Sequence, residues 1–311
     1  MRDSDTVCAV VVTYNRKNLL LECLDAIRKQ TRPVDAIYII DNASTDGTPE
    51  VLKDNGYISE LPVSNLSEPY EIEHHINNLV NGNPIKIFYV RMHRNTGSAG
   101  GFYEGVKRGY ERGYDWLWLM DDDGLPEKDC LMNQLPSDRR IVTGPLVVDP
   151  ETKLPGRGYE KFEKFPYNTK LRLFQVLFPI TVAFNGFLVS REVIGDIGFP
   201  EAGLFYQSDD VEYSIRIIKR GYKIEKRKNA IFYHPVGKEY KYLSDLKKYF
   251  VIRNRIYILL KHYGFGLKLI KNIMTFLYLM FKGHIKPKVL FFALKDGLSS
   301  KLKNRYDLGS L

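Results

Sequence analysis

The stretch from Trp116 to Asp123 reads WLWLMDDD, and a turn at Gly124 and Pro126 follows it. Five apolar residues in a row predict a short strand that is buried on both faces. The three carboxylates at its end repel one another, and the repulsion grows near a protein interior. Hard divalent cations such as Mg²⁺ and Mn²⁺ relieve it, since they prefer oxygen ligands and often share them with phosphates. We favour a metal and diphosphate site over the alternative, an acidic turn.

Strand and helix patterns alternate on the N-terminal side of this stretch. Apolar runs at residues 7–12 and 36–40 predict buried strands, and Asn18 is expected to cap the helix between them. Residues 85–90 predict a third strand, whereas residues 57–83 predict a less regular insertion with no assigned role. Such alternation predicts an α/β fold with a mostly parallel central sheet flanked by helices.

Polar residues stand at the ends of the expected strands. Thr13 and Asn15 follow the first strand, and Asp41 follows the second. Ligands of parallel sheets bind outside the carboxyl ends of the strands, so these residues are expected near the acidic cluster. The run Asn95–Gly101 holds three glycines before a predicted helix, which would let backbone approach an anionic ligand. By itself this run is a weak indicator, because it matches neither the dinucleotide fingerprint nor the P-loop.

Two further candidate sites lie in the second half of the chain. Asp209 and Asp210 begin a predicted helix whose apolar stripe excludes Glu212. One Asp is enough to cap a helix, so the second is available, and we expect the helix dipole to keep it ionised as a general base. His234 follows a short apolar run and is either structural or a metal ligand.

The charge of the chain is unevenly distributed. The net charge is +9, yet residues 214–311 hold 23 Lys and Arg against 5 Asp and Glu, so the rest is net acidic. In this basic part we expect a helix that starts at Ser244 and runs to about Tyr263, with further helical segments after it. Basic helices rich in aromatic and aliphatic residues fit an anionic membrane surface. The alternative is a helical subdomain that packs on the rest of the chain or on a second copy, as a homo-oligomer. No nucleic-acid recognition motif is found, so we expect no nucleic-acid partner.

The three cysteines and the apolar runs bear on location. Cys8, Cys23 and Cys130 are scattered and lack metal-binding spacing, which is typical of a reducing compartment. The N-terminus shows no signal-peptide pattern, and the longest uncharged apolar run, residues 272–281, is too short to span a bilayer. We expect a cytoplasmic protein that is peripheral on the inner face of the cell membrane.

Taken together, the motifs resemble family 2 glycosyltransferases. The residues that carry the resemblance are 11–16, 41–47, 95–101, 121–123, 209–213 and 234. The similarity covers residues 7–235 and is greatest to the bacterial galactofuranosyltransferase and rhamnosyltransferase branch, which residues 249–255 also resemble. It implies a GT-A catalytic domain at 1–240 and a helical, basic C-terminal region at 241–311.

The resemblance also implies an activity and a set of roles. The enzyme would move galactofuranose or rhamnose, with inversion, from a UDP- or dTDP-sugar to a hydroxyl of a cell-surface or lipid-linked glycan. Asp121, Asp123 and His234 would hold Mn²⁺ or Mg²⁺, Asp210 would be the catalytic base, and Asp209 would orient the acceptor. The donor would be bound by Thr13, Tyr14, Asn15, Arg16, Asp41, Asn95, Gly100, Asp121 and Asp122. A nucleotidyltransferase and a non-catalytic nucleotide- or nucleic-acid-binding protein remain as alternatives.

Overall fold

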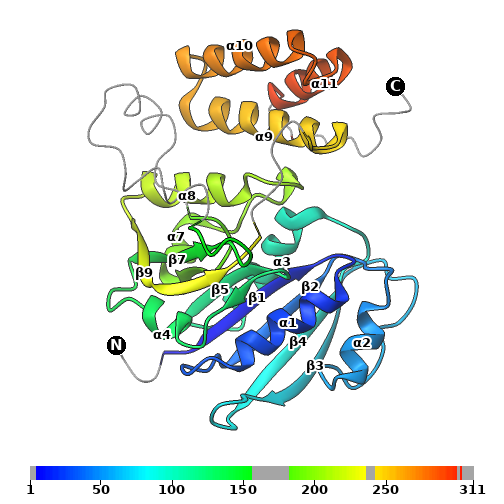
Figure 1. The fold of residues 1–311 in the computed structure, drawn as a ribbon, viewed down its shortest axis with the longest axis vertical. Coiled ribbons are helices and arrows are strands. Elements are labelled where there is room, and N and C mark those ends of the chain that lie inside the picture. The colour runs from blue at the N-terminus through cyan, green and yellow to red at the C-terminus, as the bar shows by residue number, and fades with distance from the viewer. Residues whose placement is uncertain (1–4, 156–181, 236–241, 300–301, 303–311) are drawn as a thin grey trace.

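A computed structural model describes residues 5–155, 182–235, 242–299 and 302 (Figure 1). Within them, nine strands form one sheet in the order β3-β4-β2-β1-β5-β8-β7-β9-β6. The strands are β1 (Val7–Thr13), β2 (Ala36–Asp41), β3 (Tyr70–Asn77), β4 (Pro84–Arg91), β5 (Trp116–Asp121), β6 (Leu125–Pro126), β7 (Ile141–Val148), β8 (Phe187–Ser190) and β9 (Lys223–Tyr233). The helices are α1 (Lys17–Arg28), α2 (Thr48–Asp54), α3 (Gly97–Glu111), α4 (Cys130–Gln134), α7 (Arg191–Ile197), α8 (Asp209–Lys219), α9 (Asp245–Tyr263), α10 (Leu267–Phe281) and α11 (Pro287–Gly297), with a 3-10 turn η1 (Ala202–Leu204).

The sheet is parallel at its centre and mixed at its flanks. Strands β4, β2, β1 and β5 pair in parallel, whereas β3 and β8 are antiparallel to β4 and β5. The α/β prediction is therefore confirmed, and β7 and β9 form a second parallel pair beyond β8. The prediction of an irregular insertion at 57–83 is wrong for Tyr70–Asn77, which form edge strand β3. An edge strand buries only part of its surface, so β3 carries charged and polar residues that weakened the strand signal.

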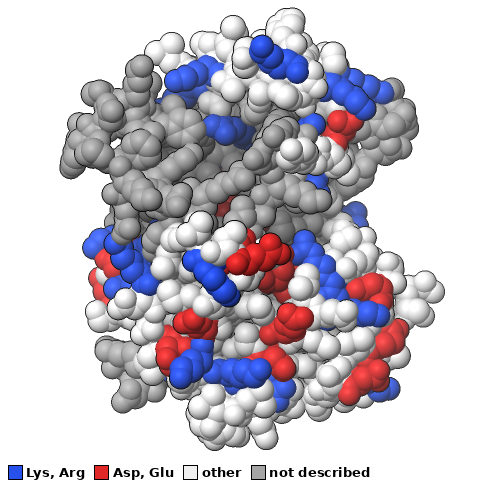
Figure 2. Space-filling view, viewed as in Figure 1, with Lys and Arg blue, Asp and Glu red and all other residues white. Residues whose placement is uncertain are grey.

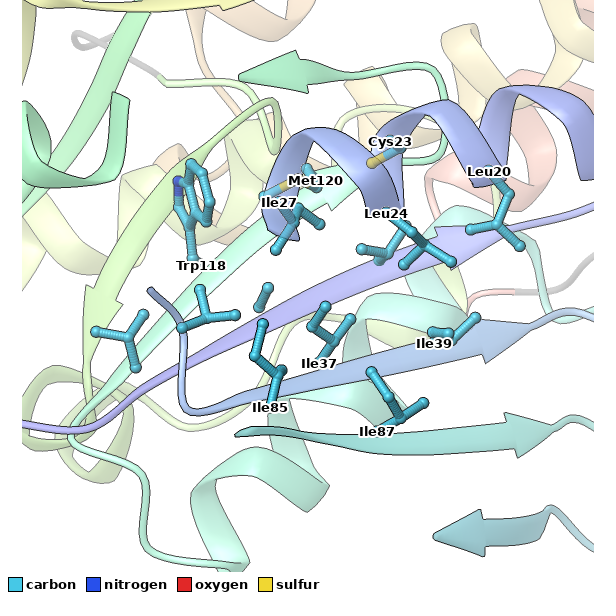
Figure 3. Packing of buried hydrophobic residues seen from close by; sticks show 14 of the residues in the cluster. Leu20, Cys23, Leu24, Ile27, Ile37, Ile39, Ile85, Ile87, Trp118 and Met120 are labelled. Carbon is cyan, nitrogen blue, oxygen red and sulfur yellow. The ribbon is translucent and has the colours of Figure 1, made fainter. Parts of the chain in front are cut away.

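Helix α1 covers one face of the sheet. Figure 3 shows its apolar side chains, among them Leu20 and Leu24, pointing toward residues of the central strands such as Ile37 and Ile39. The four apolar residues of α1 in this cluster are fully buried. Burial of a large apolar side chain such as Leu or Ile stabilises the fold by about 1.5 to 3 kcal/mol. The expected cap at Asn18 is wrong, because the helix already begins at Lys17 with no side-chain cap.

Helix α3 lies against the other face, and its glycines make that approach close. A Cβ added at Gly101 would lie 2.5 Å from Val12, and one added at Gly105 would lie 2.3 Å from Val10. These glycines recur every fourth residue, so they share the helix face that meets β1. Alternate residues of each central strand thus enter two separate cores, one under α1 and the other under α3.

The C-terminal helices α9, α10 and α11 have an apolar core of their own, and Figure 1 shows them stacked beside α8. Ser244 caps α9 by accepting a hydrogen bond from the Lys247 amide, so the predicted start of this helix is confirmed. Figure 2 shows mostly basic side chains over this region on the visible face, and a mixture of both signs over the sheet and its helices. Among the described residues, no helix is both long and apolar enough to cross a membrane.

Candidate active site

The register of the central strands gathers the predicted site residues at one edge of the sheet. Thr13 of β1 is paired with Asp41 of β2, and Val12 of β1 is paired with Asp121 of β5. The antiparallel pairing of β6 with β9 sets Leu125 opposite Tyr233, which brings His234 back beside the end of β5. Strand order, rather than sequence distance, therefore decides which polar groups meet.

Thr13 and Arg16, at the end of β1 and in the loop after it, contact the acidic cluster. The Thr13 hydroxyl donates to Oδ2 of Asp122 at 2.7 Å. One guanidinium nitrogen of Arg16 lies 3.0 Å from Asp122 and 2.9 Å from Asp123. The Asp122 side chain is almost fully buried, whereas Arg16 is half exposed. Asp122 is thus fixed within the protein, whereas part of the Arg16 side chain is exposed and accessible to a ligand.

Asp121, Asp123 and His234 form a group with the donor set of a metal site. One ligand atom from each lies within 4.8 Å of the other two. His234 Nε2 lies 3.1 Å from Oδ1 of Asp123, yet this buried oxygen has no hydrogen-bond partner among the described residues. Two carboxylates and one imidazole with an unsatisfied oxygen suit a divalent cation such as Mn²⁺ or Mg²⁺.

The ionisation of the cluster reflects competition between burial and neighbouring charge. Burial and the Asp123 charge raise the pKa of Asp121 to about 7, and burial raises the pKa of Asp122 to about 6. Burial also opposes charge on Asp123, but His234 and Arg16 outweigh it and lower the pKa of Asp123. Against its own burial, His234 has a raised pKa because Asp123 and Asp121 face it. An added cation would favour the charged form of all three carboxylates.

The loop after β1 is locked to the loop after β2. Asn15 has a left-handed backbone with φ of 53°, and its side-chain oxygen accepts a hydrogen bond from the Thr45 amide at 2.6 Å. Its own amide donates to the Ser44 hydroxyl at 2.9 Å. Tyr14, which lies between the strand and Asn15, is exposed. Asn15 therefore shapes the loop, while Tyr14 and Arg16 have surface that a ligand can reach.

Asp41 and Gly100 lie at the expected edge but have protein partners instead of open surface. Asp41 is fully buried and accepts hydrogen bonds from the Tyr89 hydroxyl at 2.7 Å and from Arg91 at 2.5 Å. A Cβ added at Gly100 would lie 2.4 Å from Thr96 in the preceding turn. Both residues therefore have structural partners, and their contact with the donor stays a prediction. Arg91 meets Asp41 because the pairing of β2 with β4 places the two residues in register.

Asn95 also has a local partner. Its side-chain oxygen accepts a hydrogen bond from the Gly97 amide at 2.8 Å, which orders the turn into α3. Gly97 has φ of 74°, and an added Cβ there would lie 1.9 Å from the Phe205 carbonyl oxygen. The glycine-rich run therefore meets the loop before α8, a contact that its sequence did not predict.

The pair Asp209 and Asp210 begins α8, as expected, and burial rather than the helix dipole decides the direction of both pKa shifts. Burial raises the pKa of Asp210 to about 6. Burial, the charge of Asp210 and that of Asp121 raise the pKa of Asp209 well above its ordinary value. Oδ2 of Asp209 is buried without a hydrogen-bond partner. Desolvation outweighs the dipole here, and the charge of Asp121 adds to the rise in the pKa of Asp209.

Glu212 is off the predicted apolar stripe of α8, yet it does not face solvent. Its side chain is completely buried, where Arg216, Lys261 and His262 surround it at 2.9 to 3.1 Å. Burial opposes the charge, but these three partners lower the pKa of Glu212 to about 2. A charged residue can occupy a buried helix face when partners on another element neutralise it. The helical pattern did not indicate this burial because two of the partners, Lys261 and His262, are on α9, about fifty residues away.

Comparison with known proteins identifies this α/β sheet, with acidic groups at its carboxyl edge, as the GT-A fold of glycosyltransferases. The family model described as glycosyl transferase family 2 matches residues 8–57 and 61–198. The chain belongs to that family. Galactofuranosyltransferase GlfT1 of Mycobacterium tuberculosis is 30% identical over 277 residues, covering 82% of this chain and 83% of that protein. GlfT1 of Mycolicibacterium smegmatis is 29% identical over 285 residues, covering 83% and 84%.

Solved structures support the same fold. A mannosyltransferase, PcManGT from Pyrobaculum calidifontis, in complex with GDP-Man and Mn²⁺, gives a TM-score of 0.54 at 16% identity, covering 95% of this chain and 87% of that one. GalNAc-T7 with UDP, GalNAc and Mn²⁺ gives 0.50 at 15% identity, covering 91% and 59%. At these identities the likeness concerns the fold alone.

Proposed function

We propose that this protein is an inverting galactofuranosyltransferase that uses a UDP-sugar donor and a glycan hydroxyl as acceptor. Within the same proposal, the sugar could instead be rhamnose, the donor nucleotide dTDP, and the acceptor a lipid-linked glycan. The observation that carries it is the place of Asp209 and Asp210 at the start of α8, where the buried Oδ2 of Asp209 has no hydrogen-bond partner among the described residues and the charge of Asp121 acts on Asp209. A base and a charged donor site at one edge of the sheet suit sugar transfer, and family membership favours it over nucleotidyl transfer.

In this proposal the acidic cluster binds the donor through a divalent ion. Asp121, Asp123 and His234 would hold Mn²⁺ or Mg²⁺, which as a Lewis acid offsets charge on the leaving diphosphate. Arg16 is half exposed and already reaches toward this region, so it can contact the diphosphate as well. Thr13 holds Asp122 in place, and Tyr14 and Asn95 border the nucleotide.

Asp210 is the proposed general base. It would take the proton from the acceptor hydroxyl as that oxygen attacks the anomeric carbon, so that one displacement inverts the centre. The pKa of about 6 suits this role, since a base with a pKa just below neutral is ionised and still accepts a proton well. Asp209 stays protonated more readily and can donate a hydrogen bond that orients the acceptor.

A sugar-nucleotide screen tests this function. Purified protein is incubated with UDP- and dTDP-sugars, with Mn²⁺, Mg²⁺ or EDTA, with and without acceptor glycans, and nucleotide release is measured. We expect metal-dependent turnover of UDP-galactofuranose and a product with inverted anomeric configuration by NMR. Asp123→Ala should weaken donor binding, whereas Asp54→Ala on the exposed end of α2 should not. Full transfer after thorough chelation, or a retained configuration, would refute the proposal.

We also propose that α10 rests on an anionic lipid surface. Five of its residues share one exposed face, with 44 to 86% of each side chain accessible: Leu267, Ile270, Met274, Tyr278 and Phe281. Lys268, Lys271 and Lys282 are on the same helix or at its end. An apolar stripe beside lysines suits insertion at a lipid interface and attraction to acidic headgroups. The predicted cytoplasmic location stays a prediction.

Point substitutions test this surface better than a truncation, because the opposite side of α10 packs in the core of the three C-terminal helices. Met274→Ser with Phe281→Ser should reduce binding to vesicles that contain phosphatidylglycerol, with little loss of transfer to a short soluble acceptor. Leu61→Ser with Val63→Ser removes two exposed apolar residues from the catalytic unit and serves as the matched control. Equal vesicle binding by both variants and the parent would contradict the proposal.

A further inference from the structure

The loop that enters α8 has an unusual backbone. Phe205, Gln207 and Ser208 all have positive φ, at 60°, 59° and 70°. Non-glycine residues in this region cost free energy and persist only where the surroundings impose them. Ser208 is the N-cap of α8, so this backbone sets the direction in which Asp209 and Asp210 emerge. The source of that constraint therefore bears on the site.

Helix α9 supplies the constraint through the Asn254 side chain. Its amide nitrogen lies 3.0 Å from the Leu204 carbonyl oxygen, 2.9 Å from that of Tyr206 and 2.8 Å from that of Gln207. Asn254 has no exposed surface. A buried amide that donates to three carbonyls of one short loop fixes their orientation, because each carbonyl would otherwise lose a partner.

Arg253 holds the same loop and also orients Asn254. Its guanidinium donates to the Gly203 carbonyl at 3.0 Å, to the Leu204 carbonyl at 2.8 Å and, through Nε, to Oδ1 of Asn254 at 2.9 Å. The bond to Oδ1 leaves the Asn254 nitrogen directed at the loop. Arg253 is likewise fully buried. The two residues form a connected polar network in which every bond has a defined direction.

The loop is packed from both sides. The Phe205 ring stacks on Phe250 of α9, with ring centroids 4.7 Å apart. On the other side the Phe205 carbonyl lies so close to Gly97 that only a glycine fits. The Phe205 loop thus lies between α3, from the catalytic unit, and α9, from the C-terminal region.

We propose that Asn254 and Arg253 are positioning residues for the acidic pair, so that helix α9 is part of the active site. They act through the carbonyls of residues 203–207, which fix the backbone from which Asp209 and Asp210 project. This inference rests on the proposed function of Asp210. A small displacement of a base from the acceptor hydroxyl is costly, since misplacement by about 1 Å can slow a reaction about a hundredfold.

Asn254→Ala tests the proposal, with Asn272→Ala as the matched control. Asn272 is also an almost buried Asn of the C-terminal helices, but its side chain donates to Lys268 within α10. We expect Asn254→Ala to lower kcat by about ten- to a hundredfold while the donor Kd, measured by calorimetry with Mn²⁺, changes less than about threefold. Asn272→Ala should change neither. An equal loss of kcat in both variants would mean a general structural role and overturn the proposal.

A double-mutant cycle separates this inference from the function on which it rests. If Asn254 acts through Asp210, then Asn254→Ala should add little to the loss in Asp210→Asn, whereas additive losses would overturn the inference. A normal kcat in Asp210→Asn would overturn the base assignment, while Asn254→Ala against Asn272→Ala still tests the loop. Should Asn254→Ala fail to fold, Arg253→Lys keeps the charge but loses the planar fork, and the same loss of kcat at unchanged donor affinity is expected.

Discussion

Asp210 and Glu212 are two residues apart on α8, yet their carboxylates have opposite environments. Glu212 is surrounded by Arg216, Lys261 and His262, which together lower its pKa to about 2 despite burial. Asp210 has no ion pair with any residue that the structure describes, and burial raises its pKa to about 6. One helix therefore carries an acid that is permanently charged and another that can exchange a proton near neutral pH.

The difference teaches how to separate structural from chemical acids. A buried carboxylate that is matched by cations stabilises the contact between two elements, here α8 and α9. A buried carboxylate left without a cation lowers stability, and such groups concentrate at functional sites. Four experiments on α8 and its partners test this division.

The largest effect is expected from Asp210→Asn. Asn keeps the size of the side chain, and its oxygen can still accept the hydrogen bond that Asp210 receives from the Val211 amide at 2.7 Å. Loss of a general base costs roughly 10²- to 10⁴-fold in rate, so kcat should fall by at least about a hundredfold at unchanged donor affinity. Steady-state kinetics measure this loss. The control is Glu192→Gln, which changes an exposed carboxylate on α7. If Asp209→Asn is inactive and Asp210→Asn is normal, the two roles are reversed.

Glu212→Gln should act on stability instead. Removing the carboxylate leaves Arg216 and Lys261 facing a neutral amide, and we expect a loss of about 3 to 5 kcal/mol in the free energy of unfolding. Urea denaturation followed by circular dichroism measures it. Glu225→Gln removes a carboxylate from a more exposed pair with Lys223 and Arg227, and should cost less than about 1 kcal/mol. Equal losses in the two variants would contradict a special role for Glu212.

The two acids should also separate on a pH scale. Asp210 works as a base only when ionised, so kcat at saturating Mn²⁺ should fall about tenfold per pH unit below its pKa of about 6. The folded-state pKa of Glu212 is lowered, so its stabilising effect is present above about pH 4.5 and is lost as the pH falls from there toward 2. Between pH 6 and pH 5 we therefore expect activity to fall while the thermal midpoint holds. A parallel decline of both would show that unfolding causes the loss.

The smallest effect is expected for Lys261→Met. Lys261 is one of three partners of Glu212, and about a third of its side chain is exposed. Without it, Arg216 still neutralises the carboxylate and His262 still contacts it. We expect at most about 1 kcal/mol of lost stability, by urea denaturation, and no change in kcat. A loss as large as that of Glu212→Gln would mean that Lys261 alone carries the contact.

Local sequence determined much of this protein. The apolar run before Asp121 predicted a central strand, because a strand buried on both faces needs no polar alternation. Polar residues at strand ends predicted the edge where Thr13, Arg16, Asp122 and Asp123 meet, since parallel strands expose their carboxyl ends together. Ser244 before an apolar pattern predicted the start of α9, because a hydroxyl there accepts a free amide of the first turn.

Tertiary structure alone decided the ionisation of the acids and the roles of several residues. Whether Asp210 or Glu212 is charged depends on burial and on partners such as Lys261 that are distant in sequence, and no local pattern reports them. Asp41 is paired with Arg91, a partner that only the pairing of β2 with β4 brings to it. Asn254 contacts the loop before α8 across about fifty residues, because folding places α9 against it. Local sequence determines which side chains could take part in chemistry. Desolvation and long-range contacts determine which of them have the ionisation state and the free surface that the chemistry needs.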